Sequence, residues 1–251
     1  MKKNNKDLAD FSGRKFELKI FENIEFKIMP HFILKLALGV RQIYVLAKSI
    51  LPERYKSIER ISDSNVAEIA QTSTSVYLDG YFQNPEIFSH VRSALLEKFK
   101  FPPLPTSLFS LGENIKRTNS VSIHVRRGDY LHPANRDYHG VLNVSYYERA
   151  TKHIAENVAN PFYFIFSDDI DWCKENLFVG GNCEFVSNKT APSWIDMALM
   201  SQCKHHIIAN SSYSWWGAWL STNNDKLVIA PRSWFANGSI SKIIPKEWIG
   251  I

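Results

Sequence analysis

Two adjacent arginines stand at the end of an apolar run, in the segment His124-Val125-Arg126-Arg127-Gly128-Asp129-Tyr130. A guanidinium group presents a planar fork of N–H donors that matches phosphate oxygens in pairs, so Arg126 and Arg127 suit a diphosphate. Gly128 allows a sharp turn, and Asp129 could orient an arginine or accept a proton. An isolated RRGD is more often a surface turn with a solvated Arg–Asp pair. Both interpretations stay open on this motif alone.

A second polar cluster, Ser167-Asp168-Asp169, ends another apolar run. Its carboxylates could bind ribose hydroxyls, orient the two arginines, or cap the helix that follows. Asp169 and Asp171 also form the D-x-D pattern of metal-dependent glycosyltransferases. A three-residue match is weak, and Asp171 is expected inside the helix, so we predict no metal site.

The third cluster, Asn210-Ser211-Ser212-Tyr213-Ser214, lies directly before a tryptophan-rich segment. Serine hydroxyls and free amides at a helix N-terminus bind anions. Since the chain contains neither a GxGxxG motif nor a P-loop, this turn is the remaining candidate for a phosphate cradle. Trp215 and Trp219 are predicted to pack in the core rather than to bind a sugar.

Asp196 stands among apolar residues on a predicted helix. A carboxylate in such surroundings needs a hydrogen-bonding partner. A guanine base offers two donors on one edge, N1–H and N2–H, and would satisfy one carboxylate.

These clusters need an α/β scaffold, which the second half of the chain predicts. Short apolar strands are expected at 121–125, 162–167, 183–187, 205–210 and 226–231, and helices at 143–157, 170–177, 193–203 and 212–221. Strands that alternate with helices favour a parallel sheet covered on both faces. Ligands of such sheets bind at the carboxyl ends of the strands, where all three polar clusters lie.

The first half of the chain is less regular. The apolar spacing predicts a helix at 29–51, and the sequence then favours a strand at 75–81 and a helix from Asn84-Pro85 to about Phe99. The segment Phe101–Thr106 contains three prolines and is predicted to be a linker. We therefore divide the chain into a first domain, 1–105, and a second domain, 106–251.

Charge and cysteine content narrow the function classes. Residues 1–60 carry 13 Lys and Arg against 7 Asp and Glu, but the basic residues are dispersed and no nucleic-acid motif is present. This flank is either simply solvated or in peripheral contact with an anionic membrane surface. The helix at 29–51 is predicted to face the core rather than a membrane. The three cysteines lack metal or disulfide spacing, and no signal peptide or membrane span is recognisable, so a cytoplasmic location is expected.

Four segments together resemble glycosyltransferase family 11, the α-1,2-fucosyltransferases. The segments are YLDGYFQNPEIF (77–88), VSIHVRRGDYL (121–131), FIFSDDIDWCKENL (164–177) and DMALMSQCKHHIIANSSYSWWGAWLS (196–221). The resemblance runs from about Gly13 to Trp234 and implies a GT-B fold of two Rossmann-like domains, the first of them incomplete here. It also implies inverting transfer of L-fucose from GDP-β-L-fucose to the 2-OH of a galactose-terminated glycan, in glycan or polysaccharide (O-antigen) biosynthesis.

The resemblance also implies roles for individual residues. Arg126 would bind the β-phosphate, His124 would line the nucleotide pocket, and Asp196 would bind guanine. The remaining donor-binding candidates are Arg127, Asp168, Asp169, Ser211, Ser212 and Tyr213. The resemblance makes 1–105 the acceptor-side domain and 106–251 the GDP-fucose-binding domain. Asp129 is the first candidate for the base. The alternatives are His124, a carboxylate of the acceptor-side domain, or no base at all if cleavage of the donor leads. Charge on the departing GDP would be met by arginines and helix-end amides, so no metal or other cofactor is expected.

One departure from the family pattern is clear. Relatives usually begin with a strand and a GGLGNQ-type loop that opens a helix, whereas Gly13 stands alone in FSGRKFEL here. We therefore expect the first βα unit to be missing, either because the sequence starts late or because it is a truncated copy. The alternatives to α-1,2-fucosyl transfer are a different linkage within the same superfamily and an inactive GDP-sugar-binding protein.

Overall fold

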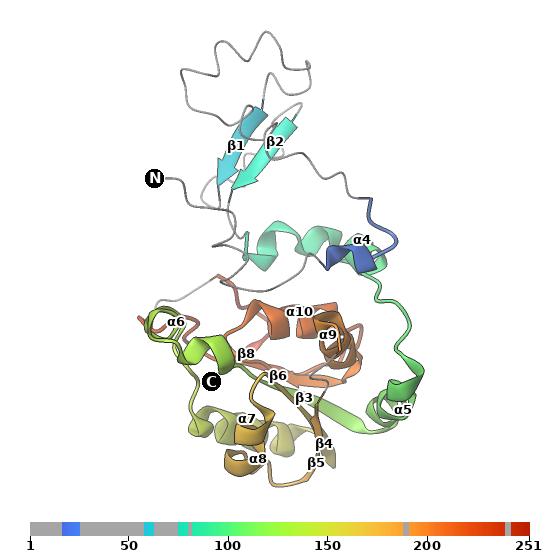
Figure 1. Ribbon diagram of the computed structural model, residues 1–251, viewed down its shortest axis with the longest axis vertical. Helices are drawn as coiled ribbons and strands as arrows, with labels where there is room; N and C mark the ends of the chain where they lie inside the picture. Colours follow the sequence, from blue (N-terminus) through green and yellow to red (C-terminus); the bar gives the residue numbers. More distant parts are fainter. Residues whose placement is uncertain (1–16, 26–57, 63–74, 80–81, 188–190, 239–241) are drawn as a thin grey trace. The chain divides into compact units, whose positions relative to one another are not determined.

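The apolar runs from residue 119 onward form one parallel sheet of six strands in the computed structural model, in the order β5-β4-β3-β6-β7-β8 (Figure 1). The strands are β3 (Asn119–Val125), β4 (Pro161–Ser167), β5 (Asn182–Val186), β6 (His205–Ile207), β7 (Val228–Ala230) and β8 (Ile249–Gly250). The structure describes residues 17–25, 58–62, 75–79, 82–187, 191–238 and 242–251. The helix expected at 29–51 lies outside these residues, and the membrane-surface alternative therefore stays a prediction.

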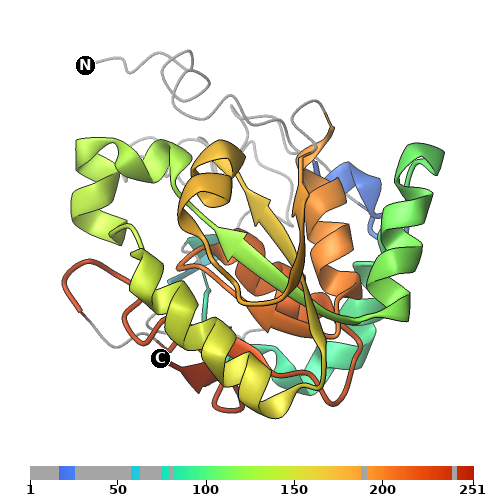
Figure 2. The same cartoon turned by 90° about the horizontal axis from the view of Figure 1, so that it is seen from below.

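Both faces of the sheet are covered, as the sequence predicts for an α/β protein. On β4, Tyr163 and Ile165 pack with α7 (Val144–Asn157) and α8 (Ile170–Asn176). Phe164 and Phe166, which alternate with them, pack with α5 (Phe109–Arg117) and α9 (Ser193–Gln202). Because successive side chains point to opposite faces, a strand buried on both sides must be apolar throughout. Seen from below in Figure 2, α7 lies in front of the sheet.

Helix α10 (Ser212–Leu220) packs directly against α9. A Cβ atom on Gly217 would lie 3.1 Å from the Cβ of Met200, so glycine permits the close approach of the two helices. Trp215 and Trp219 are 6% and 5% exposed, which confirms that they belong to the core. The N-termini of α9 and α10 supply part of the site described below.

The chain divides into two compact units, one formed by Met1–Asn23 with Leu95–Ile251 and the other by Ile24–Ala94. The smaller unit contains a parallel pair, β1 (Ile58–Ser62) with β2 (Ser75–Asp79), which confirms the strand expected there over residues 75–79. In the larger unit, Phe21 packs on Phe99 and Phe101 with ring centroids 5.1 and 5.3 Å apart. The boundary at residue 105 stays a prediction.

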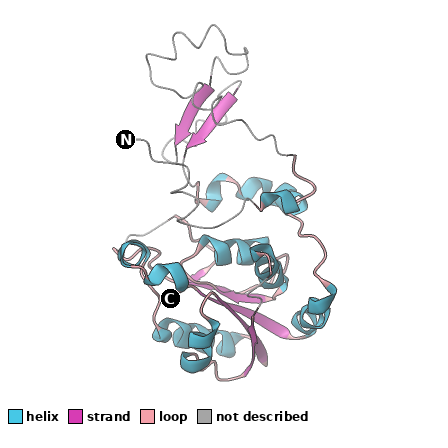
Figure 3. Ribbon diagram, viewed as in Figure 1, coloured by secondary structure: helices cyan, strands magenta, loops and turns pink. Residues whose placement is uncertain are grey.

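Several elements differ from those predicted (Figure 3). The strand at 226–231 is shorter and is not the last, because β8 pairs with it in parallel. The helix expected from Asn84 to Phe99 is broken into η4 (Pro85–Ile87), η5 (Ser89–Val91) and α4 (Arg92–Lys98), since Phe88 has φ −125° and ψ 2°, outside the helical region. The elements not predicted are the strands β1 and β8, the helices α5 and α6 (Pro133–His139), and the 3-10 turns η1 (Leu18–Ile20), η6 (Thr106–Leu108) and η7 (Gly128–Leu131).

None of the helices in the described part of the chain combines the length and apolar character needed to span a bilayer. The segment Phe101–Thr106, predicted as a linker, contains no helix or strand over residues 101–105, but its last residue, Thr106, begins η6.

Candidate functional site

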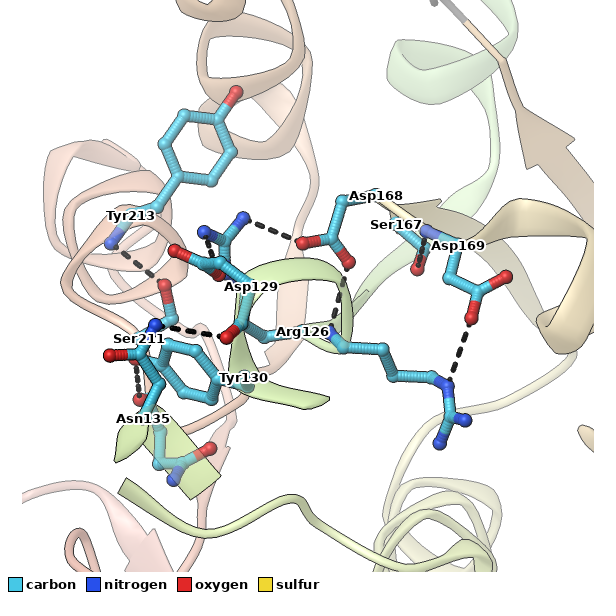
Figure 4. Close-up of polar contacts among 11 residues, drawn as sticks. Arg126, Asp129, Tyr130, Asn135, Ser167, Asp168, Asp169, Ser211 and Tyr213 are labelled. Carbon is cyan, nitrogen blue, oxygen red and sulfur yellow. Dashed lines mark hydrogen bonds and ion pairs between the residues drawn. The ribbon is translucent and has the colours of Figure 1, made fainter. Parts of the chain in front are cut away.

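The three polar clusters meet at the carboxyl edge of the sheet (Figure 4). Strand β3 pairs with β4 on one side and with β6 on the other, so the turns that follow the three strands are neighbours. Arg126 after β3 forms an ion pair with Asp168 after β4 at 2.7 Å. Tyr130 donates a hydrogen bond to the main-chain oxygen of Asn210, after β6, at 3.1 Å. These contacts join all three segments in one site.

Arg126 is shared by two carboxylates. Its Nη1 lies 2.7 Å from Asp168 Oδ2, and its Nη2 lies 2.5 Å from Asp129 Oδ1. The guanidinium carbon also lies 5.4 Å from the centroid of the Tyr130 ring. Only 18% of the Arg126 side chain is exposed, so the interpretation as a solvated surface pair does not apply to it.

Arg127 has a different set of partners. Its Nε donates to Asp169 Oδ2 at 3.1 Å, and its guanidinium carbon lies 3.9 Å from the centroid of the Trp172 ring. Asp169 is also the N-cap of α8, where its side chain accepts from the amide of Trp172. The capping interpretation of Asp169 is therefore confirmed, and Arg127 connects the β3 turn to α8 rather than joining Arg126.

Asp168 holds the turn after β3 at two points. Its Oδ1 accepts from the main-chain amide of Arg127 at 2.9 Å, while Oδ2 contacts Arg126. A Cβ atom on Gly128 would lie only 2.6 Å from Asp168 Oδ2, so any side chain at position 128 would displace this carboxylate. Glycine is needed here for the close approach of Asp168.

His124, two residues before Arg126 on β3, is a buried neutral ring. It is 5% exposed, its ring centroid lies 5.5 Å from that of Tyr213, and its Nδ1 has no hydrogen-bond partner within the described residues. Burial, and then the charge of Arg126, lower its pKa from 6.5 to about 3. A buried ring with so low a proton affinity is a poor general base near neutral pH.

The N-termini of α9 and α10 complete the site. Ser211 caps α10, and its Oγ accepts from the amide of Tyr213 at 3.3 Å, while Ser212 is exposed in the first turn. The Tyr213 hydroxyl donates to the main-chain oxygen of Ser193 at the start of α9. Burial raises the pKa of Tyr213, and the nearby charge of Asp196 raises it further. Asp196 thus lies near the cluster as a half-buried carboxylate.

In the part of the chain that the structure describes, no three His, Cys, Asp or Glu side chains lie close enough to share a metal ion. Asp171 lies within α8, is 71% exposed, and contacts Lys174 at 4.0 Å. It therefore points to solvent, whereas Asp169 contacts Arg127.

Comparison with known proteins identifies the family. The model of glycosyl transferase family 11 matches residues 16–251. The chain belongs to glycosyl transferase family 11. The family assignment implies a nucleotide-sugar donor and a glycan acceptor, and every residue of the site lies within the matched region.

Several characterised glycosyltransferases are similar to this chain. The O-antigen biosynthesis glycosyltransferase WbnK of Escherichia coli is 35% identical over 98% of this chain and 80% of its own length. An alpha-1,2-colitosyltransferase of Escherichia coli is 33% identical over 90% of this chain and 77% of its own length. Human galactoside alpha-(1,2)-fucosyltransferase 1 is 33% identical over 52% of this chain and 38% of its own length.

Two residues that support this candidate site were not predicted from the sequence. Asn135 donates from Nδ2 to the main-chain oxygen of Asp129 at 2.9 Å, and His139 stacks on Tyr130 with centroids 4.6 Å apart. Both lie on α6. Pro133 occupies the start of this helix, where proline is favoured, so a signal was present in the sequence.

Burial of His124 predicts a pH-dependent loss of stability. Below pH 6.5 the unfolded chain takes up a proton at this position, whereas the folded ring takes it up only near its pKa of about 3. The contribution of His124 to the free energy of unfolding should therefore fall as the pH falls between these values, by about 1.4 kcal/mol per pH unit.

Urea unfolding of wild type and His124→Gln tests this expectation. The stability difference between about pH 6 and pH 5 should be smaller in the variant, with equal slopes above about pH 7.5. Equal slopes over the acidic interval would show that His124 protonates normally in the folded protein.

Proposed function

We propose that this glycosyltransferase moves L-fucose from GDP-β-L-fucose to the 2-OH of a galactoside, in the biosynthesis of O-antigen or a related glycan. The observation that carries the proposal is the family match, which includes all the residues gathered at the carboxyl edge of the sheet. Relatives named for α-1,2 transfer of fucose or colitose support the linkage.

The donor would lie across the carboxyl edge of the sheet. Arg126 would bind the β-phosphate. The amides and hydroxyls of Ser211 and Ser212, at the start of α10, would donate hydrogen bonds to the phosphates. Asp196 would accept from guanine. Arg127 and Asp169 brace the turn that carries Arg126.

In transfer with inversion, the acceptor hydroxyl attacks the sugar from the face opposite the departing GDP, and a base accepts the hydroxyl proton on that face. We assign Asp129 as the base that takes the proton from the acceptor hydroxyl, since its carboxylate is 47% exposed and lies beside Arg126 in the same site. As GDP departs, negative charge grows on the β-phosphate, and Arg126 with the α10 amides would stabilise it without a metal ion. In this proposal the larger unit is the donor-binding domain of a GT-B fold.

Transfer of colitose is a second candidate, because the α-1,2-colitosyltransferase matches 90% of this chain. A different linkage within the superfamily, or GDP-sugar binding without turnover, are the remaining alternatives.

A product assay decides among these. We expect a fucosylated product from GDP-fucose and lactose in the presence of EDTA, with a new linkage to the galactose 2-OH by NMR. Product from activated colitose alone would favour the second candidate, and a different linkage would correct the acceptor position. Binding of GDP by calorimetry without any product would favour an inactive binder, and a strict need for Mg²⁺ or Mn²⁺ would refute metal independence.

Asp196→Asn should weaken GDP binding more than it weakens folding. The change replaces an acceptor oxygen by a donor that faces the guanine donors, and loss of a charged hydrogen-bonding pair costs about 1.5–3 kcal/mol. Calorimetry with GDP and a thermal melt measure the two effects. Asp137→Asn, at a position whose side chain is 74% exposed, is the control. Normal GDP affinity with a much lower melting temperature would make Asp196 a structural carboxylate instead.

A further inference from the structure

The two carboxylates on Arg126 have unequal surroundings. Asp168 is 25% exposed, and its second oxygen is held by the amide of Arg127 at 2.9 Å. It also lies directly against Gly128. Asp129 is 47% exposed and belongs to the short 3-10 turn η7, just after the glycine. Asp168 is therefore anchored by a main-chain hydrogen bond, and Asp129 is the more exposed of the two carboxylates.

The net charge of these side chains disfavours the binding of a diphosphate in this arrangement. Two guanidinium groups, Arg126 and Arg127, face three carboxylates, those of Asp129, Asp168 and Asp169. One negative charge remains in excess, and both terminal nitrogens of Arg126 are engaged. A nucleoside diphosphate carries several negative charges, and like charges at these distances repel. Arg126 has further N–H donors, but two carboxylates already offset its charge, so an anion gains most from Arg126 when one of them leaves.

We propose that the donor's phosphate replaces Asp129 on Arg126, while Asp168 stays and positions the guanidinium. This inference rests on the proposed function, because it takes a GDP-sugar as the ligand. Asp168 is then a positioning residue, and Asp129 occupies the place of the phosphate until the donor arrives. The exchange releases the Asp129 oxygen from Arg126, so this carboxylate becomes available to the acceptor hydroxyl only after the donor has bound.

Opposite effects of two isosteric substitutions on GDP binding test the proposal. Asp129→Asn removes a competing charge, so the Kd for GDP should fall by about two- to fivefold, the range expected for a partly exposed ion pair. Asp168→Asn leaves Arg126 without its anchoring charge, so the Kd should rise by about tenfold or more. Asp137→Asn, which removes an exposed carboxylate on α6, should leave the Kd unchanged.

Calorimetry with GDP on the full chain gives these values, and thermal melts show whether each variant is folded. An unchanged or higher Kd in folded Asp129→Asn would show that Asp129 is not displaced and would overturn the inference. Should Asp168→Asn fail to fold, the sign of the Asp129→Asn effect still decides. Absence of GDP binding by the wild type would instead refute the proposed donor.

A kinetic measurement separates exchange from simple electrostatics. If the exchange serves catalysis, Asp129→Asn should bind GDP more tightly and yet transfer sugar more slowly, because it binds the phosphate without supplying a base. Tighter binding with wild-type kcat would contradict a role for the released carboxylate.

Discussion

Arg126→Lys should lower kcat for sugar transfer by roughly 10²- to 10³-fold, with a much smaller change in the KM for the donor. Lysine keeps the positive charge but has no planar fork. A single ammonium group cannot reproduce two terminal nitrogens that are held 2.7 Å from Asp168 and 2.5 Å from Asp129. The charge that develops on the departing phosphate would lose its positioned donor, while contacts to guanine and ribose would preserve most ground-state binding.

Two arginines serve as controls for this substitution. Arg136 is 60% exposed and lies 3.7 Å from Asp137, so Arg136→Lys should leave kcat unchanged. Arg127→Lys should lower the melting temperature, because it loses the stacking on Trp172 and the hydrogen bond to Asp169. Its effect on kcat should be much smaller than that of Arg126→Lys. Near-wild-type turnover of Arg126→Lys would show that the assigned site is not where the transfer takes place.

Asn210→Asp should reduce the free energy of unfolding at neutral pH by at least about 3 kcal/mol. Asn210 is 2% exposed, and its Nδ2 donates to the main-chain oxygens of His139 at 2.7 Å and of Gly140 and Trp234 at 3.3 Å. Its Oδ1 has no hydrogen-bond partner among the described residues. The substitution would bury a charge and turn an oxygen towards three carbonyl oxygens, which cannot donate.

Urea unfolding measures this loss, and its pH dependence identifies the cause. The introduced carboxyl should have a raised pKa in the folded state, so the penalty should shrink as the pH falls towards about 4, where the unfolded chain also becomes protonated. Asn157→Asp provides the matched control, since Asn157 also donates to a main-chain oxygen but at an exposed position. A loss no larger than in this control would mean that the segments joined by Asn210 are held by other contacts.

The sequence by itself determined the architecture of the parallel sheet and the helices that cover it. Runs such as FYFIFS are apolar at every position, and a strand of this kind must be buried on both faces of a parallel sheet. The chain direction then places every strand's carboxyl end at one edge, so Arg126, Asp168 and Ser211 could be predicted to meet. The element that escaped prediction inside the sheet, β8, has only two residues and no periodicity to detect.

Only the tertiary structure decided what each polar residue does there. Arg126 and Arg127 are adjacent residues of the same type, and the sequence does not distinguish their partners. In the structure Arg126 contacts Asp129 and Asp168. Arg127 contacts Asp169 and Trp172. The low pKa of His124 likewise arises from burial beside Arg126. Proton affinity and ion pairing depend on which groups approach within a few ångströms, and those distances are set by the packing of segments far apart in the chain.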